Sequence, residues 1–310
     1  MHIVILDSYV TNPGDISWDP IKAIGELTLY DRTPDHLVVE RSKDAEIVLV
    51  NKTVLTSDHI QALPNLQLIC IMATGMDNVA VDYAKSKGIE VKNAKGYSTR
   101  AVAQHVFALI LELTNHVGLH NQSVQDLEWT HNVDWCYWKK GLTELSGKTI
   151  GIYGLGEIGK AVIRIAESFG MRIAVTSGHA RAEDYPNWQL VPLDELFEIS
   201  DIVSLHAPLS SKNEGVVDEA LLRKMRPESL LINTGRGGLI VNEDLRKALI
   251  KRQLAGAAMD VLSSEPPEKD HPLLGIDNCI LTPHIAWAAK ESRLRLVEIV
   301  ESNILNFQKN

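Results

Sequence analysis

The sequence is poor in cysteine and has no long apolar run. Cys70, Cys136 and Cys279 are odd in number and widely spaced, which predicts neither a disulfide framework nor a zinc cluster. No apolar stretch approaches the roughly 18 residues that a membrane-spanning helix needs. The chain begins with the strand-like run His2–Leu6, without a basic leader segment before it. We therefore expect a cytoplasmic protein that has no membrane partner and binds no metal.

Basic residues are outnumbered by acidic ones. The sequence has 31 Lys and Arg against 40 Asp and Glu, a formal net charge of −9, and it contains no basic block. This balance argues against a nucleic-acid partner, because such proteins present a clustered positive surface. A small anionic ligand would have to be held locally, by a single Arg or by the amino terminus of a helix.

Short apolar runs alternate with segments of helical spacing along the whole chain. The runs are His2–Leu6, Glu46–Asn51, Leu66–Ala73 and Glu90–Asn93, followed by Thr149–Tyr153, Arg172–Thr176, Ile202–Leu205, Leu230–Asn233, Gly256–Met259 and Cys279–Leu281. Continuous apolar strands alternating with helices indicate parallel sheets covered on both faces. We predict an α/β protein with two doubly wound parallel-sheet (Rossmann-like) domains and an inter-domain cleft, where ligand sites tend to lie.

Two long helical patterns mark the domain boundaries. One begins near Ala101, and the last, Ala288–Phe307, is expected to return to the first domain. We predict a discontinuous, flavodoxin-like substrate-binding domain of residues 1–99 plus 285–310. Residues 100–284 would then form the dinucleotide-binding Rossmann domain.

An aromatic-rich excursion, residues 118–141, breaks the alternation of strands and helices. It carries Trp129, Trp135, Tyr137 and Trp138. Exposed aromatic patches usually find a partner surface, so we expect a homodimer formed through this excursion. A lid over the site and a packed loop are the alternatives.

A glycine pattern follows the apolar run Thr149–Tyr153. Gly154 would permit a tight turn, Gly156 would let a pyrophosphate approach the backbone, and Gly159 would let the following helix pack closely. Such a pattern alone is weak, but the strand before it and the helix after it strengthen the prediction of a dinucleotide site. The expected contacts in this loop are Gly154, Leu155, Gly156, Glu157, Ile158 and Gly159.

The next predicted strand ends without the acidic residue that NAD-preferring domains usually place there to bind the ribose 2′-hydroxyl. Ser177 occupies that position, and His179 and Arg181 follow it. A hydroxyl with cationic neighbours can receive a 2′-phosphate, which a carboxylate would repel. The pattern favours NADP(H) and leaves NAD(H) possible, since a neutral turn can also bind NAD.

Three further motifs lie at or just beyond predicted strand ends. Arg236 follows Leu230–Asn233, Glu265 precedes two prolines, and His284 follows Pro283. Each alone is more often an ordinary surface or structural residue. Together they supply what reduction of a 2-oxo acid needs: Arg236 to hold the carboxylate, His284 to donate a proton and Glu265 to orient the imidazole.

These motifs resemble the D-isomer-specific 2-hydroxyacid dehydrogenase family over nearly the whole chain. The similar features are the glycine loop 154–159, Ser204–Leu209, Ile232–Gly237, Met259–Pro266 and Pro283-His284. The resemblance implies that Arg236, Glu265 and His284 are catalytic, and that the backbone of Met72–Asn78 helps to bind the substrate carboxylate. It also implies that Asp260 orients the nicotinamide carboxamide.

The resemblance implies further contacts on both ligands. The other expected cofactor contacts are His206, Ala207, Pro208, Asn213, Thr234, Gly235, Arg236, Asp260, His284 and Ala286. The expected substrate contacts are Asn51, Ala73, Thr74, Gly75, Arg236, His284 and Trp287.

Local motifs suggest a branch within that family. Tyr137-Trp138 and His284-Ile-Ala-Trp287 look most like the glycerate dehydrogenase/hydroxypyruvate reductase branch. We therefore expect hydride transfer from NAD(P)H to a small 2-oxo acid, hydroxypyruvate or glyoxylate, giving a D-2-hydroxy acid. The alternatives are another D-2-hydroxyacid specificity, or a cofactor-sensing, corepressor-like interaction protein. A methyltransferase with a glycine loop would leave the Arg, Glu and His motifs unexplained.

Overall fold

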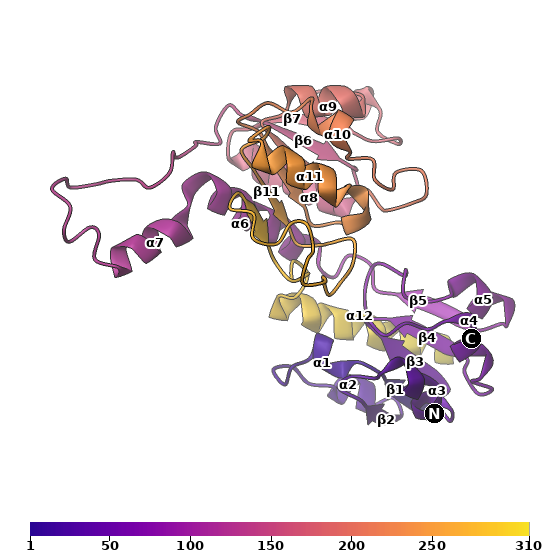
Figure 1. Cartoon of the computed structure of the whole chain (residues 1–310). Coiled ribbons are helices and arrows are strands. Elements are labelled where there is room, and N and C mark those ends of the chain that lie inside the picture. The colour runs from indigo at the N-terminus through magenta and orange to yellow at the C-terminus, as the bar shows by residue number, and fades with distance from the viewer. Residues whose placement is uncertain (310) are drawn as a thin grey trace. The chain divides into compact units, whose positions relative to one another are not determined.

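The computed structural model of the chain describes residues 1–309 and divides into two compact units (Figure 1). Unit 1 comprises Met1–Ser98 together with the segment from Trp287 onward, and unit 2 comprises Thr99–Ala286. Each unit contains one parallel sheet with helices packed on it. Two parallel-sheet α/β domains were predicted, and the structure confirms this fold class.

Unit 1 is built on a five-stranded sheet of order β2-β1-β3-β4-β5, the flavodoxin order of doubly wound folds. Its strands are β1 (His2–Ile5), β2 (Glu26–Leu29), β3 (Ile47–Val50), β4 (Leu68–Ile71) and β5 (Glu90–Asn93). Its helices are α1 (Ser8–Thr11), α2 (Asp19–Lys22), η1 (Asp35–Leu37), α3 (Val38–Ser42), α4 (Ser57–Gln61), α5 (Val81–Ser86) and α12 (Lys290–Gln308).

The central strands of unit 1 are the ones that the sequence pattern predicted. Every residue of β3 and β4 is buried, as expected for parallel strands covered on both faces. The edge strand β2 has no buried residue, and its mixed sequence escaped prediction. The returning helix α12 packs on β4 and α2. It is held by Arg293, whose two terminal nitrogens donate to the carboxylate of Asp15 at 2.6 and 2.7 Å.

Unit 2 is built on a seven-stranded parallel sheet of order β12-β11-β10-β9-β6-β7-β8. Its strands are β6 (Thr149–Tyr153), β7 (Arg172–Thr176), β8 (Gln189–Leu190), β9 (Ile202–Leu205), β10 (Leu230–Asn233), β11 (Gly256–Met259) and β12 (Cys279–Leu281). Its helices are α6 (Thr99–Asn115), α7 (Val117–Gln125), α8 (Glu157–Ser168), η2 (Ala182–Asp184), α9 (Leu193–Ile199), α10 (Glu219–Leu222), η3 (Gly237–Leu239) and α11 (Asn242–Ile250).

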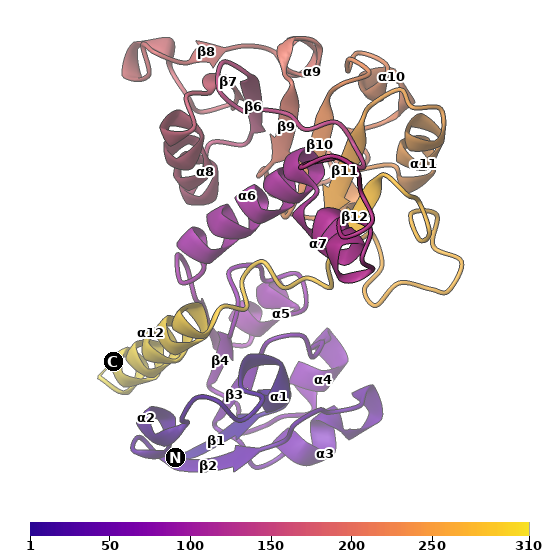
Figure 2. The same cartoon turned by 90° about the vertical axis from the view of Figure 1, so that its left-hand side faces the viewer.

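The sheet of unit 2 has a core on each face. Helices α6 and α8 lie on one face and α9, α10 and α11 on the other (Figure 2). Their apolar side chains form the two cores. The strand order reverses between β6, which continues to β7 on one side, and β9, which begins the other half. In doubly wound folds ligands bind beyond the carboxyl ends of the strands at this switch point, so the loops after β6 and β9 are where a cofactor is expected.

The aromatic excursion of residues 118–141 begins as a helix, which the sequence pattern did not predict. Helix α7 covers its first part, and an irregular segment returns from there to β6. In Figure 1 this helix and segment extend away from the sheet of unit 2.

Candidate active site

The three glycines of the loop after β6 have different structural roles. Gly154 has φ +103°, and a Cβ there would lie 2.4 Å from the backbone nitrogen of Ala207 in the loop after β9. A Cβ at Gly159 would lie 2.4 Å from the carbonyl oxygen of Gly154, so α8 and the turn pack backbone to backbone. Gly156 instead faces open space, with nothing within 4 Å of a Cβ built on it. This space lies at the amino terminus of α8, where backbone N–H groups attract a phosphate.

An unsatisfied polar atom lies at the end of β10. The hydroxyl oxygen of Thr234 is buried and has no hydrogen-bond partner among the described residues. The next residue is fixed, because Gly235 N–H donates to the side-chain oxygen of Asn233 at 3.0 Å. Buried hydroxyls normally have partners, so an orphan beside a cofactor loop fits a ligand contact. With the open cradle at Gly156, it makes the described residues suitable for a bound dinucleotide.

The loop after β9 is shaped by its own side chains. Asn213 accepts from Ser210 N–H at 2.7 Å and donates to the carbonyl oxygen of Pro208 at 2.8 Å, so it braces the loop. The ring Nε2 of His206 lies 2.8 Å from the hydroxyl of Ser204. Burial lowers the pKa of His206 to about 4, which keeps the imidazole neutral. The backbone of His206 and Ala207 therefore lies against Gly154, and Asn213 braces the same loop further along the chain.

The end of β7 presents no carboxylate at Ser177. The Ser177 hydroxyl accepts a long hydrogen bond of 3.4 Å from the N–H of His179. His179 and Arg181 are both exposed. Residues 177–181 of this turn therefore carry no carboxylate, and the acidic residues Glu183 and Asp184 follow in η2.

Glu265 and His284 are brought together although they are 19 residues apart. The Nδ1 atom of His284 lies 2.5 Å from Oε2 of Glu265, and the two side chains are 27% and 33% exposed. The other oxygen of Glu265 accepts from the N–H of Leu262 at 3.0 Å, which fixes the carboxylate. A carboxylate only accepts, so Nδ1 carries the hydrogen and Nε2 is the ring nitrogen that would exchange a proton with a substrate.

Arg236 lies on the neighbouring loop, which packs directly on the loop of Glu265. A Cβ at Gly237 would lie 1.9 Å from the carbonyl carbon of Leu262, so only glycine allows this approach. The carbonyl oxygen of Arg236 accepts from the amide of Asn233 at 2.9 Å, and its guanidinium donates to the carbonyl of Gly235 at 2.9 Å. The Arg236 and Glu265 loops are thus held against each other by backbone packing.

Asp260, at the end of β11, is buried and contacts the loop that carries His284. Its carboxylate accepts from the N–H groups of Ile285 and Ala286, both at 2.9 Å. Sequence reasoning assigned Asp260 to the nicotinamide, and the structure adds a role in holding the loop of His284. The partner of this carboxylate on α6, His105, was missed, because a histidine within an apolar-periodic helix gives no sequence signal.

Unit 1 contains the other predicted substrate contacts. Asn51 is buried, and its amide donates to the carbonyl oxygen of Met72 at 2.7 Å, which ties the ends of β3 and β4 together. Thr74 donates to the carbonyl of Ala94 at 3.0 Å, which fixes the loop that also includes Ala73 and Gly75. Asn51 and Thr74 therefore shape this loop. Whether the loop binds substrate stays a prediction.

Two further residues of unit 1 have structural roles that the sequence did not indicate. The carboxylate of Asp7, missed before, accepts from the backbone N–H groups of Asn51, Lys52 and Thr53 at 2.6–3.0 Å. Trp287 is buried and packs edge-on against Tyr97, with ring centroids 6.2 Å apart. The indole of Trp287 is a packing element of unit 1, and its predicted contact with substrate stays a prediction.

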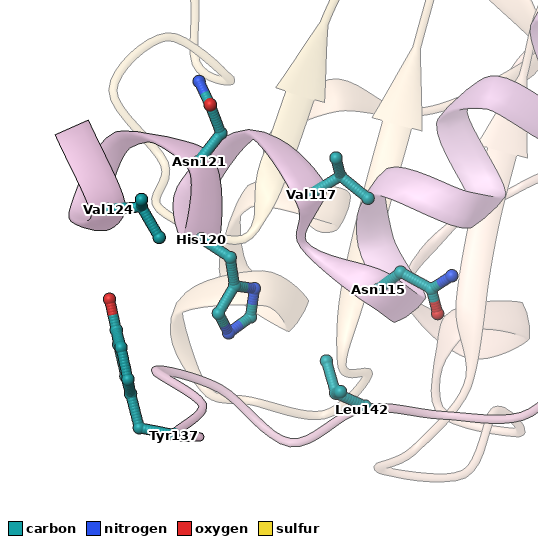
Figure 3. A pocket seen from close by; sticks show the side chains of 7 residues that line it. All are labelled: Asn115, Val117, His120, Asn121, Val124, Tyr137 and Leu142. Carbon is teal, nitrogen blue, oxygen red and sulfur yellow. The ribbon is translucent and has the colours of Figure 1, made fainter. Parts of the chain in front are cut away.

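The excursion beyond α6 holds a pocket of its own. The pocket has a volume of ≈ 460 Å³ and is lined by side chains of α7 and of the returning segment (Figure 3). The lining residues are Asn115, Val117, His120, Asn121, Val124, Tyr137 and Leu142. Nearby, Trp135 is 95% exposed and Trp138 is 67% exposed, which leaves large apolar surfaces uncovered in this chain.

The described residues contain neither a candidate membrane-spanning helix nor a candidate metal-binding cluster. None of the helices in residues 1–309 is both long and apolar enough to cross a membrane. Within the same residues, no group of three or more His, Cys, Asp or Glu side chains is arranged to hold a metal ion.

Comparison with known proteins agrees with this geometry. A family profile described as "D-isomer specific 2-hydroxyacid dehydrogenase, NAD binding domain" matches residues 107–286. The hydroxypyruvate reductase of Blautia hydrogenotrophica is 44% identical over 313 residues, covering 100% of this chain and 97% of that protein. The glycerate dehydrogenase of Methylorubrum extorquens is 35% identical over 277 residues, covering 89% of this chain and 86% of that protein.

A solved structure adds the same family likeness. The NADPH-dependent glyoxylate/hydroxypyruvate reductase of Sinorhizobium meliloti, in complex with NADP and malonate, superposes with a TM-score of 0.83 at 26% identity. The match covers 98% of this chain and 92% of that one. The profile, the relatives and the paired Glu265 and His284 lead to one conclusion. The chain belongs to the D-isomer specific 2-hydroxyacid dehydrogenase family.

Proposed function

We propose that this dehydrogenase reduces hydroxypyruvate and glyoxylate to the corresponding 2-hydroxy acids, with NADPH as the preferred reductant. The observation that carries the proposal is the pair of Glu265 and His284, with the loop of Arg236 packed beside it. The substrate class is supported by relatives named hydroxypyruvate reductase, glycerate dehydrogenase and glyoxylate reductase.

Three residues of unit 2 have different roles in the reduction. The guanidinium of Arg236 binds the substrate carboxylate and draws electron density from the adjacent carbonyl. His284 passes the proton on Nε2 to the carbonyl oxygen, and Glu265 stabilises the imidazolium from which that proton leaves. A bound reduced nicotinamide supplies the hydride for the carbonyl carbon. The cradle at Gly156 and the hydroxyl of Thr234 hold this cofactor.

The preference for NADPH follows from the turn after β7. Ser177 offers a hydroxyl where an acidic residue would select NAD, and the exposed Arg181 can pair with a 2′-phosphate. The variant Ser177→Asp should therefore lower kcat/KM for NADPH and leave kcat/KM for NADH unchanged or raised. The matched variant Ser168→Asp places the same charge on an exposed residue at the carboxyl end of α8 and serves as control.

A homodimer through the excursion of residues 118–141 is part of the same proposal. Its apolar side chains at Trp129, Val133 and Trp135 are 51%, 96% and 95% exposed. Contact of so much apolar surface with water is unfavourable and is typical of a protein–protein interface. Sedimentation equilibrium should give twice the mass of one chain. Replacing Trp135 and Trp138 with Ser should shift the equilibrium to monomer.

The decisive experiment follows nicotinamide absorbance with purified enzyme. Hydroxypyruvate, glyoxylate and pyruvate are titrated separately against NADPH and NADH. We expect the highest kcat/KM for hydroxypyruvate or glyoxylate with NADPH. Preference for pyruvate would show that the enzyme has another substrate specificity within its family. Preference for NADH would refute the role of Ser177 in selecting NADPH.

A further inference from the structure

The backbone at His284 has a conformation that needs outside support. His284 has φ +54°, in the left-handed region that side chains other than glycine rarely adopt. Such a conformation persists only where the surrounding structure enforces it. The two N–H groups that follow, those of Ile285 and Ala286, both donate to the carboxylate of Asp260 at 2.9 Å. Asp260 therefore fixes the direction in which the chain leaves the imidazole.

Asp260 is in turn held by a chain of hydrogen bonds that ends on helix α6. The hydroxyl of Thr282 lies 2.6 Å from Oδ1 of Asp260. The Nε2 atom of His105 lies 3.1 Å from the same hydroxyl and 3.5 Å from Oδ1. Because a carboxylate only accepts, the hydroxyl proton of Thr282 points to Asp260. The hydroxyl oxygen must then accept from His105, so Nε2 of His105 carries a hydrogen.

The carboxylate at the centre of this chain is ionised. Burial raises the pKa of Asp260, but the hydrogen bonds donated by His105, by Thr282 and by the backbone outweigh that effect. The pKa consequently lies below its ordinary value of 3.8. An ionised Asp260 can accept from every donor around it, as the arrangement of the loop requires.

Helix α6 gives the chain of hydrogen bonds a fixed end. The neighbours of His105 on the helix, Ala103, Val106 and Phe107, are buried in the core between α6, α8 and the sheet. The imidazole of His105 is 19% exposed and points to the end of β12. Its position is set by the helix and does not depend on the loop of His284.

We propose that His105 is a positioning residue for the reduction. Acting through Thr282 and Asp260, it keeps the loop of His284 in the conformation that pairs the imidazole with Glu265. The inference rests on the proposed role of His284 as proton donor. A positioning residue of this kind should affect kcat, whereas binding of the cofactor diphosphate at the cradle of Gly156 should not change.

The test compares two replacements of similar size. In His105→Gln the side-chain amide can still donate to the hydroxyl of Thr282, whereas in His105→Leu no donor remains. We expect His105→Leu to lower kcat with hydroxypyruvate about five-fold or more, the effect of one lost hydrogen bond. The dissociation constant for NADPH, measured by fluorescence, should stay within about two-fold of wild type. His105→Gln should recover most of kcat.

A second variant interrupts the same chain of hydrogen bonds at Thr282, between His105 and Asp260. Thr282→Val removes the hydroxyl and preserves the shape of the side chain. Its loss of kcat should match that of His105→Leu, and the double variant should be no worse than either single one, because both break one chain. This comparison holds even if His105→Leu folds poorly, since Thr282→Val can be measured alone.

The outcomes separate this inference from the proposed function. Wild-type kcat in His105→Leu, equal losses of kcat in the Gln and Leu variants, or additive losses in the double variant would each overturn the positioning role. His284→Asn is measured in parallel. If it turns over at the wild-type rate, the proposed proton donor is wrong, whatever the His105 variants do.

Discussion

Replacing Glu265 with Gln tests the core of the proposed mechanism. The change removes one negative charge 2.5 Å from Nδ1 of His284 and keeps the size of the side chain. A hydrogen bond to a charged group is worth about 1.5–3 kcal/mol, which corresponds to a loss of about 10- to 150-fold in rate. The N–H of Leu262 and the imidazole meet different oxygens of Glu265, so the single carbonyl oxygen of the amide can face only one of them. We expect kcat at neutral pH to fall within that range.

The pH dependence of kcat should also shift in a defined direction in Glu265→Gln. In reduction the imidazole must be protonated, so kcat falls as pH rises. Without the countercharge of Glu265 the imidazolium of His284 is less favoured, and the fall should begin at lower pH. The assay is NADPH oxidation with saturating hydroxypyruvate between pH 5 and 9, with Glu268→Gln as a matched control on the same loop. An unshifted profile with wild-type kcat would refute the role of Glu265.

The remaining predictions concern packing and acid stability. Gly237→Ala places a Cβ 1.9 Å from the backbone of Leu262, so it should abolish turnover or soluble expression, unlike a Gly141→Ala control, where a Cβ has nothing within 4 Å. Asp15→Asn should lower Tm at pH 7, because Arg293 lowers the pKa of that carboxyl. The difference from wild type should shrink as pH falls below 3.8 and vanish only below the lowered pKa of the folded state, where the carboxyl of Asp15 is neutral in both states. Burial lowers the pKa of His206 to about 4, so the unfolded state binds the extra proton and stability should fall from about pH 6.5 to pH 4. A His206→Gln variant should flatten that slope in urea titrations, and parallel slopes would contradict the assignment.

Much of the architecture was readable from residue patterns. All six strands predicted for the second sheet have the bounds that the apolar runs indicated, because strands covered on both faces need continuous apolar side chains. The edge strands β2 and β8 were missed. Strand β2 mixes polar and apolar residues without a buried one, and β8 has only two residues, so neither gives a continuous apolar run.

The chemistry of the site was only partly readable. Arg236, Glu265 and His284 stand at strand ends, and their types alone suggested reduction of a 2-oxo acid. The contact of Glu265 with the imidazole of His284 was expected, but the packing of the Arg236 loop on the Glu265 loop was not. Nothing in the sequence indicated that Gly237 lies against the backbone of Leu262.

Residue patterns alone were enough to place most of the strands, the glycine turn and the kinds of side chain available for chemistry. These follow from local periodicity and from residue type, which do not depend on distant neighbours. Only the three-dimensional structure shows that Gly237 lies against the backbone of Leu262 and that His105 on α6 reaches the end of β12. Parallel strands joined by crossovers bring loops together that are far apart in the chain, so these contacts depend on the order of strands in the sheet.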